Sequence, residues 1–159
     1  MRPHPTETGR YQIAYGRRRL RAAAELGRPV RAVVKPLSDE QLVIAQGQEN
    51  NERKDLSFIE RAIFAAQLET RGFGRETIMA AMCVDKTGLS RLISSAVRIP
   101  RDIIQAIGPA PKTGRDRWSD LAVALDIPDA VEGARRVIAS PGFPNARRLP
   151  VVSNEEVLT

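Results

Sequence analysis

Several arginines follow a glycine at the point where a short strand pattern gives way to a helical pattern. Large residues alternate over 11–15, which predicts a strand, and arginine then occupies 17–19 and 21, directly after Gly16. The N-terminus of a helix offers unpaired backbone N–H groups and the positive end of the helix dipole, both of which favour phosphate. Cations are disfavoured there, so this cluster indicates a bound anion. The alternative is that the arginines spread over the surface or pair with acidic residues.

A second pattern with functional meaning covers 75–93. Two short helices are predicted there, with Cys83 in the turn between them, where a glycine is usual, and the spacing of the apolar residues is typical of a helix-turn-helix. The second helix, about 86–97, would enter the major groove of DNA. The alternative is an ordinary helical hairpin with a solvated polar face. The predicted packing positions are Ile78, Met82, Val84, Leu89 and Leu92; the predicted base-edge contacts are Lys86, Thr87, Ser90 and Arg91, and the predicted phosphate contacts are Ser94, Ser95 and Arg98.

Charge is unevenly distributed along the 159 residues, whose net charge is +6. The segment 1–35 has nine basic and two acidic residues, 36–70 has three and seven, and 71–118 has nine and four. Two basic segments therefore flank an acidic one, which favours a polyanionic partner such as nucleic acid. A solvated charged surface is the alternative.

Rare residue types exclude several classes of protein. The chain has one histidine, His4, and one cysteine, Cys83, which argues against a catalytic triad, a disulfide scaffold and a zinc site built on thiolates. We expect Cys83 to be a small buried hydrophobe and Trp118 to anchor helix packing. No stretch approaches the roughly 18 apolar residues that span a membrane, and the N-terminus lacks an apolar signal segment. These features predict a reducing, cytoplasmic location.

The remaining elements are predicted from local signals. A helix is expected over 17–26, a second strand over 30–35, and a helix from the N-cap Ser38 toward Glu49. Another helix begins at a capping box formed by Ser57 and Glu60. Pro100 is expected to end the second helix of the pair, 108–111 is a linker, and two more helices are expected over 118–125 and 129–138. The apolar stripe expected after the capping box is Ile59, Ala62, Ile63 and Ala66.

Two motifs in order resemble the ParB plasmid and chromosome partition family. Residues 11–22 resemble its Tyr-x-Ile-x-x-Gly-x-Arg-Arg-x-x-Ala motif, and 49–60 resemble its Glu-Asn-x-x-Arg-x-Asp-Leu-x-x-Ile-Glu motif. A helix-turn-helix next in the chain completes the family's order, so the resemblance covers about 2–107. The tract 107–112 and the pair Arg117-Trp118 further resemble RepB, the ParB-type member of repABC plasmid systems.

The resemblance implies a CTP-dependent DNA clamp. It assigns Gly16, Arg18 and Arg19 to the triphosphate, Glu49 and Asn50 to a bridging Mg²⁺, and Arg53 to the arginine of the second motif. Such groups suit this chemistry, because arginine bonds phosphate oxygens strongly and Mg²⁺ prefers hard oxygen ligands. Without the resemblance, 49–50 reads as the C-terminal turn of a helix with Asn50 as its cap. Arg17 stands where chromosomal members often have an acidic residue linked to CTP turnover, which favours binding over hydrolysis.

The predicted fold is α+β. Residues 1–55 form a partial ParB/sulfiredoxin-like nucleotide-binding part, truncated at its N-terminus relative to the family, 56–139 form an all-helical helix-turn-helix domain, and 140–159 form a flexible tail. The predicted function is sequence-specific binding of a plasmid centromere-like site, with CTP and Mg²⁺ as cofactors. Expected partners are double-stranded DNA, a ParA-type ATPase and a second copy of the chain, with no membrane. The alternatives are a CTP-hydrolysing enzyme stimulated by DNA, and a plain helix-turn-helix repressor.

Overall fold

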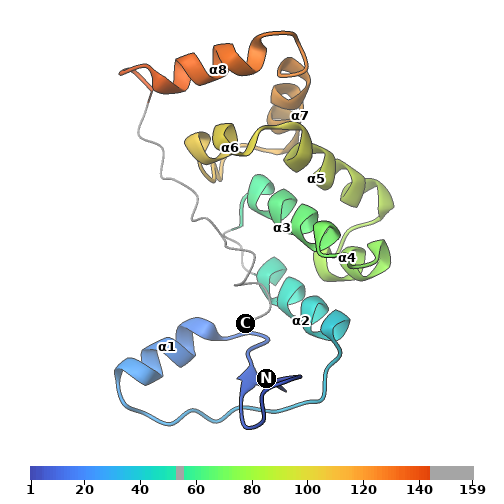
Figure 1. The fold of residues 1–159 in the computed structure, drawn as a ribbon, viewed down its shortest axis with the longest axis vertical. Coiled ribbons are helices and arrows are strands. Elements are labelled where there is room, and N and C mark those ends of the chain that lie inside the picture. The colour runs from blue at the N-terminus through green and yellow to red at the C-terminus, as the bar shows by residue number, and fades with distance from the viewer. Residues whose placement is uncertain (53–55, 144–159) are drawn as a thin grey trace.

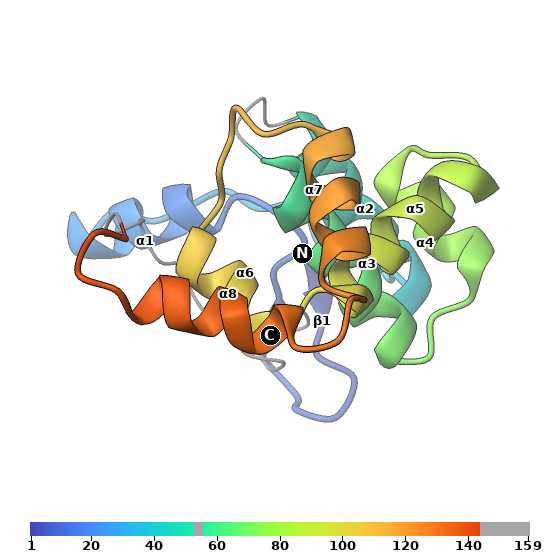
Figure 2. The ribbon, with the colours of Figure 1, turned by 90° about the horizontal axis from the view of Figure 1, so that it is seen from above.

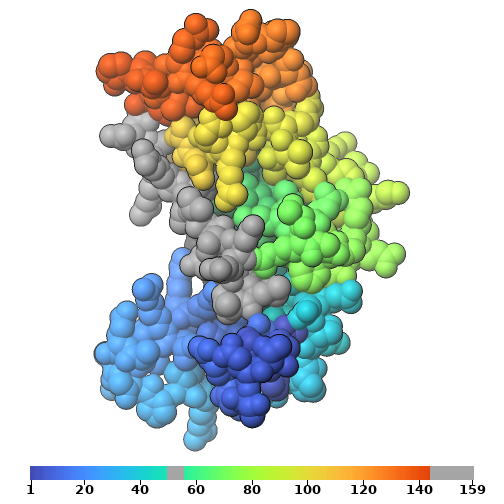
Figure 3. Space-filling model, in the orientation of Figure 1, coloured from blue at the N-terminus to red at the C-terminus, as the bar shows by residue number. Residues whose placement is uncertain are grey.

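The computed structural model describes residues 1–52 and 56–143, and the side chains of 50–52 lie outside the description. In Figure 1 the N-terminal lobe (residues 1–37) lies at the lower end and the last helix at the upper end. The helices within residues 39–139 form the helical body. Figure 3 shows the lobe and the helical body as successive parts of one elongated molecule. The elements in chain order are β1 (Arg2–Pro3), β2 (Tyr11–Gln12), α1 (Arg17–Glu25), α2 (Asp39–Glu52), α3 (Phe58–Thr70), α4 (Arg75–Met82), α5 (Lys86–Arg98), α6 (Arg101–Ile107), α7 (Arg115–Ala124) and α8 (Ala130–Ala139).

The N-terminal lobe contains a small antiparallel sheet in which Arg2 lies opposite Gln12. The strand predicted over 11–15 forms only over Tyr11–Gln12. The strand predicted over 30–35 is wrong, because this segment is not assigned to any sheet. It makes two backbone hydrogen bonds to Met1, from the Met1 amine to the Val33 carbonyl at 3.0 Å and from Lys35 N–H to the Met1 carbonyl at 2.9 Å. Two bonds to a single residue do not build a strand ladder.

The helical body is organised around α3, which packs along α5 and also contacts α4 and α7, while α2 packs along α4. Figure 2, which looks along the molecule from above, shows α3, α5 and α7 gathered together. Trp118 on α7 is only 1% exposed, so its predicted role as a packing anchor is confirmed. The buried side chains of this core come from every helix between α2 and α7 and include Val43, Ile59, Leu68, Ile78, Leu89, Ile103, Ile104, Trp118 and Leu125.

The start of α3 confirms the predicted capping box. The Ser57 N–H donates to the Glu60 carboxylate at 2.9 Å, and the Glu60 N–H donates to Ser57 Oγ at 3.4 Å. The buried face differs from the predicted stripe, because α3 is covered from more than one direction. Ile63 and Ala66 are only half-buried, and the fully buried positions are Ile59, Ala62, Ala65 and Leu68.

No sequence pattern predicted the helix α6. Pro100 does end α5, but it also serves as the N-cap of α6, which buries Ile103 and Ile104. A helix of seven residues is too short to show a clear period of 3.6, so composition alone did not reveal it. The helix predicted over 118–125 begins three residues earlier, at Arg115. Among the residues that the structure describes, no helix has the length and apolar character needed to span a bilayer.

Candidate nucleic-acid interface and phosphate site

A sharp turn joins α4 to α5. Cys83 ends α4 in the left-handed conformation, with φ 51°, and its N–H donates to the Met79 carbonyl. Asp85 then caps α5, because its carboxylate accepts a hydrogen bond from the Gly88 N–H at 2.7 Å. Cys83 thus occupies the turn as predicted, but the prediction that it is buried is wrong. Its side chain is exposed, since the left-handed turn carries it out of the core.

One face of α5 is fixed in the core. Of the predicted packing positions, Leu89 and Leu92 on this helix are buried. Ile78 and Met82 on α4 are buried as well, and Val84 in the turn is partly buried against the same core. Ser95 also lies on this face, at 4% exposure, and its hydroxyl donates to the Arg91 carbonyl at 3.0 Å. The predicted phosphate contact at Ser95 is therefore wrong, because this position is three residues after the buried Leu92 and shares its side of the helix.

The opposite face of α5 is open to solvent. It carries the predicted base-edge residues Lys86, Thr87, Ser90 and Arg91, all of which are exposed, and Ser94 is exposed as well. Neither Lys86 nor Arg91 forms an ion pair with any residue that the structure describes. These two cations are therefore available to an external anion.

Arg98, at the C-terminal end of α5, has an internal partner. Its guanidinium forms an ion pair with Asp126, in the turn that follows α7. Both side chains are partly exposed, so water screens the ion pair. Asp126 therefore holds the Arg98 guanidinium only weakly against another anion. A phosphate contact at Arg98 stays a prediction, and it requires the guanidinium to exchange Asp126 for phosphate.

The N-terminus of α1 has the features of an anion site. Its N-cap is Gly16, with φ 87°, no side chain caps it, and its first turn has no acidic residue. The first backbone hydrogen bond runs from Leu20 N–H to the Gly16 carbonyl at 3.0 Å, so the amides of Arg18 and Arg19 have no acceptor one turn back. The Arg19 guanidinium lies over Gly16, where an added Cβ would be 3.6 Å from its terminal nitrogen. These amide and guanidinium donors fit a phosphate group.

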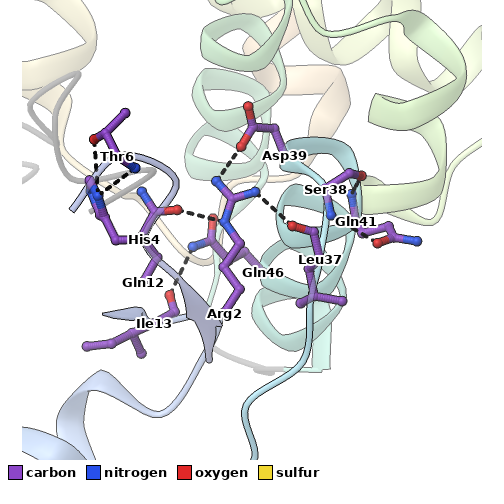
Figure 4. Close-up of polar contacts among 10 residues, drawn as sticks. All are labelled: Arg2, His4, Thr6, Gln12, Ile13, Leu37, Ser38, Asp39, Gln41 and Gln46. Atoms are coloured by element: carbon purple, nitrogen blue, oxygen red, sulfur yellow. Dashed lines mark hydrogen bonds and ion pairs between the residues drawn. The ribbon is translucent and has the colours of Figure 1, made fainter. Parts of the chain in front are cut away.

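A buried glutamine holds this junction against α2. The Gln46 side chain donates to the Ile13 carbonyl at 3.2 Å, as Figure 4 shows. Ile13 precedes Gly16 by three residues, and Glu49 follows Gln46 by about one helical turn. The two segments that carry the predicted phosphate and Mg²⁺ residues are therefore linked in space, and Glu49 is half-buried.

The two other residues that the resemblance assigns in the second motif are Asn50 and Arg53, and the structure describes no side chain for either. Because α2 runs on to Glu52, Asn50 lies inside the helix, and the alternative that it is a C-terminal cap is wrong. The side chain of Asn50 is outside the described part, and Arg53 lies outside the described residues. The Mg²⁺ ligand set therefore stays a prediction.

A buried arginine that sequence reasoning missed ties the lobe to α2. Arg2 is only 5% exposed, donates to Gln12 Oε1 at 2.7 Å and to the Leu37 carbonyl at 3.0 Å, and forms an ion pair with Asp39 in the first turn of α2 (Figure 4). No local pattern marks Arg2, because its partners are distant in sequence. This network holds the sheet at the start of α2. Gln46 holds the segment that follows β2 against the same helix, further along.

Family models match both parts of the chain. Residues 52–147 match the family described as RepB plasmid partitioning protein, and residues 1–51 match the ParB N-terminal domain. The chain belongs to the RepB plasmid partitioning protein family. This confirms the resemblance to ParB-type and RepB-type partition proteins, and the mixed α+β fold with a helical part is confirmed as well.

Relatives and a solved structure agree with this membership. The chain is 55% identical over 126 residues to a putative replication protein B of Rhizobium rhizogenes, covering 79% of this chain and 40% of that protein. It is 46% identical over 143 residues to a putative replication protein B of Sinorhizobium fredii strain NBRC 101917 / NGR234, covering 90% of this chain and 44% of that protein. The chain thus spans about two fifths of the length of these curated relatives.

The solved structure is that of the C-terminally truncated chromosome-partitioning protein ParB from Caulobacter crescentus, complexed to the centromeric parS site. The two chains superpose with a TM-score of 0.52 at 27% sequence identity, over 86% of this chain and 72% of that one. The similarity therefore extends over both the lobe and the helical body.

Proposed function

We propose that α4, the turn and α5 form a helix-turn-helix that binds double-stranded DNA at a plasmid centromere-like site, in a sequence-specific manner. The observation that carries the proposal is the division of α5 into two faces. Leu89 and Leu92 fix one face in the core, while the other presents Lys86 and Arg91 to solvent without acidic partners among the described residues. Membership of the partitioning family and the similarity to a ParB bound to its centromeric site support it.

Within this proposal the exposed residues of α5 divide into two roles. Arg91 lies in the second turn, on the side away from Leu89 and Leu92, and would bond a guanine edge in the major groove. Lys86, Thr87 and Ser90 would reach neighbouring base edges. Ser94 and Arg98 would contact the phosphate backbone, which positions the helix without reading sequence.

The same proposal assigns a nucleotide to the N-terminal lobe. Gly16, Arg18 and Arg19 would bind the phosphates of CTP, and Glu49 and Asn50 would hold Mg²⁺. Arg53, the arginine of the second motif, would also contribute to nucleotide binding. The uncapped, acid-free start of α1 supports the phosphate half of this assignment. When bound, the metal would neutralise phosphate charge; the chain's own contribution is to orient the phosphates with amide and guanidinium donors.

Two protein partners belong to the proposal through the family. A second copy of the chain would place two α5 helices on half-sites about one DNA turn apart, as helix-turn-helix dimers do. A ParA-type ATPase would act on the DNA-bound protein during partition.

A selection followed by titration tests the DNA-binding proposal. Duplexes with a randomised segment are selected on the chain, and the enriched duplex and a scrambled version are then titrated by fluorescence anisotropy at several salt concentrations. We expect the enriched duplex to bind roughly 10³-fold or more tightly than the scrambled one, with log affinity falling linearly as log salt rises. Equal affinity for both duplexes at every salt concentration would overturn sequence-specific binding.

A further inference from the structure

A partly buried arginine on α3 stands behind the α4–α5 turn. The Arg61 Nη2 donates to the Met82 carbonyl at 3.2 Å, and its Nε is buried without a hydrogen-bond partner. No acidic side chain of the described residues pairs with it. Taking a guanidinium out of water costs free energy unless another group compensates. A cation in this position therefore calls for a structural or functional explanation.

The compensating group is the C-terminal end of α4. Met82 is the last residue of that helix, where carbonyls lack helical partners and the helix dipole is negative. Arg61 supplies both a donor and a positive charge to this end. The next residue is Cys83, and α5 begins four residues after Met82, so the contact lies immediately before the turn that aims α5.

The same end of α4 is confined from a second side by α2. Gly47 packs so closely on Ala81 that an added Cβ would lie 2.5 Å from the Ala81 carbonyl oxygen and 2.7 Å from the Ala81 Cβ. The last two residues of α4 are therefore held between α2 and α3. Gly47 blocks displacement toward α2, and the hydrogen bond from Arg61 restrains the same end of α4 from the side of α3, directly before the turn.

We propose that Arg61 is a positioning residue for α5: its bond to the Met82 carbonyl fixes the turn so that Arg91 faces the base edges of DNA. The inference rests on the proposed DNA-binding function and deepens it. Arg61 acts through the backbone of α4 and does not bond phosphate. Its loss would therefore reduce discrimination between duplexes without removing a phosphate contact.

The test compares Arg61→Met with the matched control Arg71→Met. Arg61 lies within α3 and Arg71 is its C-cap, and both are partly buried. Both changes remove one positive charge and leave an unbranched apolar side chain in its place. We expect Arg61→Met to lower the affinity ratio of enriched to scrambled duplex about tenfold, with the slope of log affinity against log salt unchanged. Arg71→Met should leave the ratio unchanged. An unchanged ratio in a folded Arg61→Met chain would overturn the proposal, and so would a salt slope reduced by about one, because that marks a direct phosphate contact.

Amide hydrogen exchange gives a readout that needs no DNA. The Cys83 and Val84 N–H groups both donate to the Met79 carbonyl, so their exchange reports opening of the turn. We expect both amides to exchange about tenfold faster in Arg61→Met and at the wild-type rate in Arg71→Met. If Arg61→Met does not fold, Arg61→Lys, which keeps a charged donor, replaces it and should give a smaller change in the same direction. A wild-type chain that binds all duplexes alike would overturn the proposed function, whereas unchanged exchange would overturn the role of Arg61 by itself.

Discussion

The helices α1 and α5 both present arginines to solvent, but they are anchored very differently. α5 buries Leu89, Leu92, Ile93 and Ser95, whereas no residue of α1 is buried. The direction of α5 is therefore determined by the core before any ligand arrives. A helix of nine residues is only marginally stable by itself in water, so α1 depends on its connection to the rest of the lobe, which Gln46 on α2 holds at the Ile13 carbonyl.

The contrast extends to the parts of the molecule that carry these helices. In the helical body the apolar side chains of α3, α4, α5 and α7 form one continuous core. In the N-terminal lobe several large apolar side chains remain exposed, and these are Tyr11, Tyr15, Leu26, Val30, Val33 and Val34. A ligand that binds only the folded lobe would stabilise the lobe by mass action, whereas the helical body is stabilised by its own buried core.

The largest effect that we predict is the loss of a core side chain. Leu68→Ala on α3 removes a fully buried side chain and should lower the free energy of unfolding by about 2–5 kcal/mol. Leu20→Ala on α1 changes only a half-buried side chain and should cost less than about 1 kcal/mol. The measurement is denaturant unfolding followed by fluorescence of Trp118, the single tryptophan. Equal losses in the two variants would show that the lobe and the body are packed alike.

The next effect concerns the proposed phosphate site at the N-terminus of α1. Arg19→Ala removes a charged hydrogen bond of about 1.5–3 kcal/mol, which should weaken CTP binding roughly ten- to a hundredfold. Isothermal titration with CTP, with and without Mg²⁺, measures this, and Arg28→Ala, just beyond the C-terminal end of α1, is the control. CTP binding that is equally strong in Arg19→Ala and wild type would remove α1 from the nucleotide site.

A change at the α2–α4 crossing should be of intermediate size. Gly47→Ala places a methyl group against the Ala81 backbone and should destabilise the fold by about 1–3 kcal/mol. The matched control is Gly133→Ala in the middle of α8, where nothing lies within 4 Å of the added Cβ, so the change should stabilise by up to about 1 kcal/mol. Thermal unfolding of both variants checks the pair. A neutral Gly47→Ala would mean that α2 and α4 can separate freely.

The smallest effect is a pH dependence at the joint between α6 and α8. A hydrogen bond from Arg135 Nε, at 2.8 Å, lowers the pKa of the Asp102 carboxyl below its ordinary value of 3.8. A carboxyl whose pKa is lowered by folding stabilises the fold above its unfolded pKa, and this contribution disappears as the pH falls through the lower, folded pKa. The wild type should therefore exceed Asp102→Asn in thermal midpoint at pH 5–7 and lose this small advantage below pH 3.8. A difference that grows as the pH falls would contradict the assignment.

Features that depend on neighbours in sequence were the ones that could be predicted. The Ser57–Glu60 capping box, the turn at Cys83 and the buried positions Leu89 and Leu92 all follow from spacing within one or two helical turns. The arginine motif at Gly16 was recognisable because its characteristic residues all lie within one short segment, 11–22.

Features that depend on long-range packing could not be predicted. The partners of Arg2 are 10 to 37 residues away, and the carbonyl that accepts from Arg61 is 21 residues away. Ser95 is different, because the local spacing from Leu92 already indicates the core, although its polar side chain suggests a contact with phosphate. The segment 30–35 has the composition of a strand, yet composition does not supply the neighbouring strand that pairing requires.

We propose that the open face of α5 reads DNA sequence, and Arg91 is the side chain on which this reading should chiefly depend. Wild type and Arg91→Ala are titrated with the enriched duplex and with a set in which each base pair is replaced in turn. We predict that Arg91→Ala loses about 1–3 kcal/mol on the enriched duplex and becomes indifferent to one G·C pair that the wild type requires. If Arg91→Ala instead weakens all duplexes equally and keeps every base preference, α5 lies across the phosphates, and the account of this helix as the reading element is wrong.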